Sequence, residues 1–152
     1  MVFRGDGELG AVVEGAVSSL WSVRAAAGCR LAVWGGIEEV ADVIGRLLLD
    51  GRDAAVVQET AAALLGREDV IGMRCVLLAL SRACADGAVG HLGAALDCDP
   101  GWRTAEGEDR LVGQLRELAE DAGAGVRGEA RRILAGLRPG GEGARGCGRA
   151  GP

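Results

Sequence analysis

The chain has 152 residues but contains no lysine, asparagine or tyrosine, and only 3% of its residues are aromatic. A Walker-type phosphate loop needs a lysine, so that site is excluded. The missing residues have AT-rich codons, whereas the abundant glycine, alanine, valine and arginine have GC-rich codons. The composition therefore indicates a GC-rich bacterial genome, such as that of an actinomycete. Leucine, valine and alanine must fill the core because aromatic side chains are scarce.

Residues suited to catalysis or metal binding are also few. His91 is the only histidine, and a zinc site needs several histidine or cysteine ligands. No nucleophile is spaced to use His91 as a base. The five cysteines are an odd number without a close pair, which is poor evidence for a disulfide framework. We therefore expect no catalytic residue, no cofactor and no metal, and we expect the cysteines to behave as small apolar residues.

Three segments partly match known ligand-binding motifs. Residues 5–10 and 141–146 both read G-x-G-x-x-G, but a dinucleotide site needs a strand before the motif and a helix after it. Residues 97–108 have the length of a calcium-binding loop, but Trp102 stands where such a loop needs glycine. None of the three is expected to bind its ligand.

The charge of the chain restricts its partners. The formal net charge is −5 at pH 7, which argues against nucleic acid and against an anionic membrane surface. The apolar stretches are too short for a transmembrane helix, and the first residues do not resemble a signal peptide. We therefore expect a cytoplasmic protein that binds neither nucleic acid nor membrane.

Apolar residues recur at helical spacing through most of the chain. The pattern predicts seven helices, over 8–27, 38–49, 53–65, 68–85, 87–96, 107–122 and 125–137. Between residues 70 and 84 the strongly polar side chains form one narrow stripe of Arg74, Ser81 and Arg82. A helix that is apolar around the rest of its circumference needs neighbours on several sides, so the helix over 68–85 should be central.

Glycines lie inside the predicted helices, where each costs roughly 1 kcal/mol relative to alanine. They either permit close helix packing or only reflect the codon bias. In both cases the isolated helices are weak, and stability must come from stacking. These glycines include Gly45, Gly72, Gly90, Gly93, Gly113 and Gly128.

A helix-opening pattern recurs after three aspartates, Asp53, Asp86 and Asp121, which are spaced by 33 and 35 residues. Each has one short amphipathic helix before it and one after it, which is typical of an α-solenoid. The sequence therefore predicts an all-α fold, a short right-handed solenoid of about three antiparallel helix pairs. Residues 1–37 should form an N-terminal capping helix and connector, residues 38–137 the repeats, and residues 138–152 a disordered glycine-rich tail.

The segment from Asp121 to Leu137 resembles the second helix of a HEAT repeat, because Val126-Arg127 follows the aspartate by five residues. Residues 53–66 resemble a second copy, although Val57 stands where arginine is expected. The resemblance covers about 38–137. It implies protein binding on a concave face formed by the second helices, which begin near residues 53, 86 and 125. The exposed polar residues expected on that face are Gln58, Glu59, His91, Arg127 and Arg131.

The function expected from this resemblance is a non-catalytic protein–protein interaction module or adaptor, with a protein partner that the sequence does not identify. Two alternatives stay open. One is an enzyme-associated helper, such as a HEAT-like lyase subunit; a HEAT-like DNA glycosylase is disfavoured by the acidic charge. The other is a bacterial immunity or regulatory protein.

Overall fold

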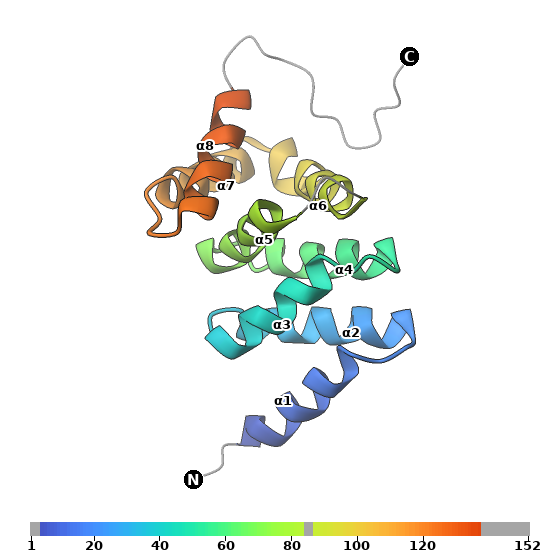
Figure 1. The fold of residues 1–152 in the computed structure, drawn as a ribbon. Helices are drawn as coiled ribbons and strands as arrows, with labels where there is room; N and C mark the ends of the chain where they lie inside the picture. The colour runs from blue at the N-terminus through green and yellow to red at the C-terminus, as the bar shows by residue number, and fades with distance from the viewer. Residues whose placement is uncertain (1–3, 84–86, 138–152) are drawn as a thin grey trace.

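The computed structural model describes residues 4–83 and 87–137 (Figure 1). This part of the chain is all-helical, with eight α-helices, two short 3-10 helices and no β-strand, so the expected all-α class is confirmed. The predicted tail, residues 138–152, lies outside the described residues. The elements are α1 (Arg4–Gly15), α2 (Trp21–Leu31), η1 (Ala32–Trp34), α3 (Glu38–Leu48), α4 (Ala54–Leu65), α5 (Val70–Arg82), α6 (Gly87–Asp97), η2 (Pro100–Arg103), α7 (Ala105–Leu118) and α8 (Ala124–Gly136).

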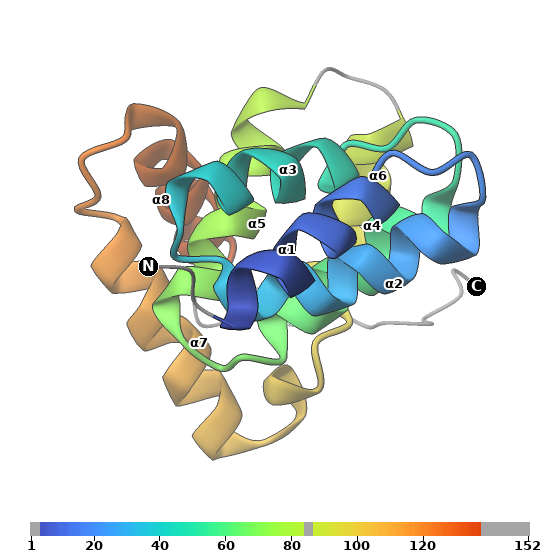
Figure 2. The ribbon, with the colours of Figure 1, turned by 90° about the horizontal axis from the view of Figure 1, so that it is seen from below.

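The helices pack mainly as two rows (Figures 1 and 2). One row contains α2, α4 and α6, and the other contains α3, α5 and α8. Helix α1 lies against α2 at one end, whereas α7 packs against η2, α8 and α5 at the other. Apolar side chains from all eight helices form or pack against the buried core between these elements, and among the fully buried ones are Leu31, Ile44, Leu64, Leu77 and Leu115.

Helix α8 does not occupy the place expected for it. The sequence predicts that the helices beginning near residues 53, 86 and 125 line one face. Helices α4 and α6 are neighbours, but α8 packs against α5 and α7 in the other row. The 3-10 helix η2 packs closely against α7, which runs at a steep angle to α2 and α4 (Figure 2). Because α8 lies in the other row, α4, α6 and α8 do not line one face as expected.

The predicted helix over 8–27 is wrong, because the chain breaks between α1 and α2. The apolar spacing continues across the break, but Leu20 has an extended backbone (φ −87°, ψ 122°) and stands at the N-cap of α2. Its N–H donates to Ser18 Oγ at 3.1 Å. Such local side-chain bonds compete with helical ones. Helix α2 also packs extensively against α4, so it belongs to a row, and α1 lies at the end of the stack.

The prediction that the helix over 68–85 is central is confirmed. Helix α5 contacts α3, α4, α6, α7 and α8, and Met73, Val76 and Leu77 are buried on it. Gly72, in its first turn, lies so close to α4 that an added Cβ would collide with the carbonyl group of Leu64. Close packing therefore accounts for Gly72.

Several of the other glycines within the predicted helices have no such contact. A Cβ added at Gly45, Gly113 or Gly128 would have no neighbouring atom within 4 Å. Packing therefore does not account for these three glycines, and the codon bias is the interpretation left for them.

Two arginines, Arg67 just before α5 and Arg74 within it, connect distant segments. Arg67 Nη1 donates to the carbonyl oxygens of Ala32 and Val33 at 2.8 and 2.9 Å. The guanidinium of Arg74 binds both carboxylate oxygens of Asp121, at 3.0 and 3.1 Å, and so connects α5 to the α7–α8 loop. Arg82 is exposed, as expected. Backbone carbonyls and carboxylates are good acceptors for a guanidinium, so these arginines stabilise the packing of neighbouring elements.

Candidate functional site

The turn between α1 and α2 exposes a group of large apolar side chains, which we call the apolar corner: Val17, Leu20, Trp21 and Val23. Val17 is 73% exposed, Leu20 is 62% exposed and Trp21 is 47% exposed. Scattered apolar residues are normal at a surface, but neighbouring ones that include a tryptophan are typical of a binding surface. In the predicted helix over 8–27, the apolar spacing places Val17, Leu20 and Val23 on one buried side, so their exposure is not expected from the sequence.

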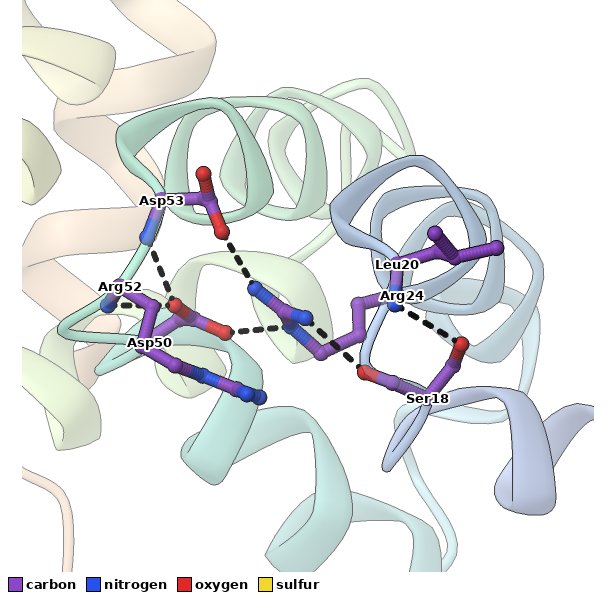
Figure 3. Close-up of polar contacts among 6 residues, drawn as sticks. All are labelled: Ser18, Leu20, Arg24, Asp50, Arg52 and Asp53. Atoms are coloured by element: carbon purple, nitrogen blue, oxygen red, sulfur yellow. Dashed lines mark hydrogen bonds and ion pairs between the residues drawn. The ribbon is translucent and has the colours of Figure 1, made fainter.

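A buried arginine holds this corner in place (Figure 3). Arg24 is only 1% exposed. Its Nη1 donates to the carbonyl oxygen of Ser18 at 2.9 Å, and its Nε and Nη2 donate to Asp50 Oδ2 at 2.8 Å and Asp53 Oδ2 at 2.6 Å. We call this group the Arg24 clamp. It joins the α1–α2 turn to the α3–α4 loop, while the Leu20 side chain points away from it (Figure 3).

The clamp changes the role that the sequence predicts for Asp53. An aspartate before a helix ordinarily caps it, but Asp53 makes no side-chain cap bond to α4. Its carboxylate binds Arg24 instead, because a charged donor makes a stronger hydrogen bond than a backbone N–H. Asp50 Oδ1 accepts the N–H groups of Arg52 and Asp53, at 2.8 and 2.9 Å, and so closes the loop.

The clamp and the other ion pairs predict loss of stability in acid. Burial raises the pKa of Asp50, but hydrogen bonds from the backbone N–H groups of Asp53 and Arg52 and from Arg24 outweigh it, and the net pKa is lowered. Arg74 chiefly lowers the pKa of Asp121. A carboxylate with a lowered pKa stabilises the fold above its ordinary pKa of about 3.9, and this stabilisation is lost as the pH falls through the lowered value.

We therefore expect the free energy of unfolding, measured with urea at several pH values, to fall steeply below about pH 4. The Asp50→Asn variant should be less stable at pH 7 and should lose less on acidification. Asp42→Asn is the control, since the Asp42–Arg46 pair is solvent-exposed, and its acid profile should match the wild type. Equal profiles for Asp50→Asn and the wild type would contradict the role of Asp50.

The predicted surface residues on α8 serve the α7–α8 junction. Arg127 Nη1 donates to the carbonyl oxygen of Asp121 at 2.8 Å and to that of Ala122 at 3.3 Å. Arg131 Nε donates to the carbonyl oxygen of Ala119 at 3.1 Å. Both guanidinium groups thus hold carbonyls at the end of α7 and in the following loop.

The other predicted surface residues lie on α4 and α6. Gln58 is exposed and lines a groove described below, whereas Glu59 is exposed and its carbonyl oxygen accepts a bond from Cys29 Sγ at 3.7 Å. His91 is half-buried on α6. The five predicted residues are therefore divided between helices of different rows.

A groove of about 710 Å³ lies between α4, α6, η2 and the first turns of α7. Its apolar lining includes Ala62, Leu65, Ala94, Ala95 and Pro100, and its charged or polar lining includes Gln58, Glu68, Asp99, Thr104 and Arg110. Two hydrogen bonds shape the wall: Asp99 Oδ1 accepts the N–H of Gly101 at 2.7 Å, and Thr104 Oγ1 accepts that of Gly107 at 3.0 Å. The sequence does not predict this groove, because its lining comes from four elements.

One cysteine in the lining of this groove differs from the expectation that the cysteines are unpaired. Cys98 lines the groove and is disulfide-bonded, whereas Cys29 and Cys75 are free thiols. The spacing of the cysteines gave no sign of a bridge. Trp102 packs against the core, and its Nε1 donates to the carbonyl oxygen of Leu96 at 2.9 Å.

Comparison with known proteins found no matching family, no similar curated protein and no similar solved structure. Within residues 4–83 and 87–137, no group of three or more histidine, cysteine, aspartate or glutamate residues is arranged to hold a metal ion. None of the helices in these ranges is both long enough and apolar enough to span a membrane.

Proposed function

We propose that the chain is a protein–protein interaction module, built as a short HEAT-like helical stack, whose partner docks on the apolar corner. The observation that carries the proposal is the exposure of Val17, Leu20 and Trp21 at one turn. Burial of apolar surface drives most protein association, and tryptophan is enriched among the residues that dominate binding energy.

The surroundings of the corner support docking of an apolar partner segment. A second, smaller cavity of about 220 Å³ is lined by Val17 together with Val13, Val43, Leu47 and Arg24. A cavity of this kind suits one aliphatic side chain of a partner. The Arg24 clamp fixes the backbone of the turn before binding, which reduces the entropy lost when a complex forms.

Substitutions at the corner test this function. Leu20→Ser removes a largely exposed side chain and should leave the melting temperature nearly unchanged, whereas Trp21→Ser also removes the buried half of a large ring and should lower the melting temperature by a few degrees. Each should weaken partner capture from extracts of the native host by about tenfold or more, the effect of losing a residue at the centre of an interface. Capture is measured by quantitative mass spectrometry against the wild type.

Val33→Ser provides the matched control. Val33 is 69% exposed but lies at η1, outside the corner. Its substitution should leave capture unchanged. Equal capture by Leu20→Ser, Trp21→Ser and the wild type would refute docking at this corner.

A further inference from the structure

Arg110, in the groove between α4, α6, η2 and α7, has donor capacity that the described residues do not use. Its Nε is buried without a hydrogen-bond partner in this part of the chain. Its Nη1 lies 3.9 Å from Glu68 Oε2, which is too far for a hydrogen bond. Buried polar groups are ordinarily hydrogen-bonded, and each exception needs a physical explanation.

Glu68 is a poor permanent partner for this guanidinium. Its side chain is 62% exposed, so its attraction for Arg110 is weakened by solvent. Its backbone has a positive φ of 62°, a conformation that costs a non-glycine residue roughly 1–2 kcal/mol. Strained residues of this kind occur preferentially where a site binds a ligand.

We propose that the groove binds a small monocarboxylic acid with an aliphatic body, whose carboxylate replaces Glu68 as the partner of Arg110. The guanidinium matches a carboxylate, since the N–H groups of its two Nη atoms can donate to both oxygens, whereas Nε is not exposed to the groove. The aliphatic body packs against Ala62, Leu65 and Ala94 of the lining. A volume of about 710 Å³ is in the usual range for small-molecule sites.

The charges of the groove restrict the ligand further. Its lining contains the carboxylates of Glu68 and Asp99 and the guanidinium of Arg110. A dianion such as a phosphate monoester would meet one cation and two carboxylates, and repulsion would oppose it. An ammonium ion placed at Arg110 would be repelled by the guanidinium, and Asp99 Oδ1 already accepts the N–H of Gly101. A single carboxylate with an apolar body fits both the cation and the apolar walls.

Octanoate is the probe, and isothermal titration calorimetry on the full chain measures its affinity. Octanoate should bind, and octylamine of the same chain length should not. Shortening the acid to hexanoate should weaken binding by about fourfold for each methylene removed, which corresponds to about 0.8 kcal/mol per buried methylene. Equal affinity for the acid and the amine, or no binding of octanoate, would overturn the proposal.

Two variants test whether octanoate binds through Arg110 or only through burial of its hydrocarbon chain. Arg110→Met should weaken octanoate binding by about tenfold or more, as expected for loss of a charged hydrogen bond. Glu68→Gln should tighten it, because a competing carboxylate is removed. Arg116→Met is the control, since Arg116 is an exposed arginine on the same helix. Unchanged affinity in both Arg110→Met and Glu68→Gln would also overturn the proposal.

The groove and the apolar corner are tested independently. Leu20→Ser and Trp21→Ser should bind octanoate as the wild type does. If Arg110→Met loses the captured protein partner while octanoate fails to bind the wild type, the groove takes a segment of a protein and the small-acid proposal is wrong.

Discussion

Replacing Gly72 with alanine should lower the free energy of unfolding by about 3 kcal/mol or more. The new Cβ would collide with the carbonyl group of Leu64, and a backbone carbonyl cannot rotate away as a side chain can. Helices α4 and α5 would have to separate, and the other contacts of the central helix would loosen with them. Urea unfolding followed by circular dichroism measures the effect.

A glycine-to-alanine substitution at a helical position without close neighbours should raise the free energy of unfolding instead. Gly113 lies in the interior of α7, where an added Cβ meets no atom within 4 Å. Gly113→Ala should therefore stabilise the protein by about 0.5–1 kcal/mol, because alanine is the better helix former. If Gly72→Ala were as stable as Gly113→Ala, the close approach of α4 and α5 would be refuted.

The Arg24→Met variant should lower the melting temperature by about 10 °C or more. Methionine fills a similar volume but leaves the carboxylates of Asp50 and Asp53 without their guanidinium. A charge left unpaired at a buried site is strongly destabilising. The α1–α2 turn also loses its hydrogen bond to the carbonyl oxygen of Ser18. Partner capture through the apolar corner should therefore fall together with the melting temperature.

A triple variant distinguishes the effect of losing the ion pairs from the effect of changing the side-chain volume. Arg24→Met with Asp50→Asn and Asp53→Asn should recover part of the lost melting temperature, since no carboxylate then lacks its partner. The control is Arg46→Met, because the Arg46–Asp42 pair is solvent-exposed at 3.4 Å and such pairs contribute little. A fall for Arg46→Met as large as that for Arg24→Met would contradict the special role of the clamp.

The sequence predicts local structure better than the contacts between distant segments. The narrow polar stripe on the helix over 68–85 correctly predicts the many neighbours of α5. The spacing of polar and apolar residues along a helix indicates how much of its circumference is buried. Periodicity does not reveal the break at Ser18, since the apolar spacing continues through it. Gly72 and Gly113 have similar helical settings in the sequence, and only the packing of α4 against α5 distinguishes them.

The candidate sites could not be predicted because they combine residues that are far apart in the sequence. Arg74 and Asp121 are 47 residues apart, and Arg24 and Asp53 are 29 apart, so nothing in either local pattern indicates that they meet. The apolar corner was missed because Val17, Leu20 and Val23 fit a core pattern. Arg110 was not singled out because its setting depends on α4, α6 and η2, which the fold brings together.

Site-specific photocrosslinking tests most directly whether the apolar corner is the docking surface. Benzoylphenylalanine in place of Trp21, in cells that express the chain natively, should form a covalent adduct with one protein on irradiation. The same probe in place of Val33 should not form that adduct. An adduct of equal yield at both positions, or an adduct at position 33 alone, would contradict docking at the corner.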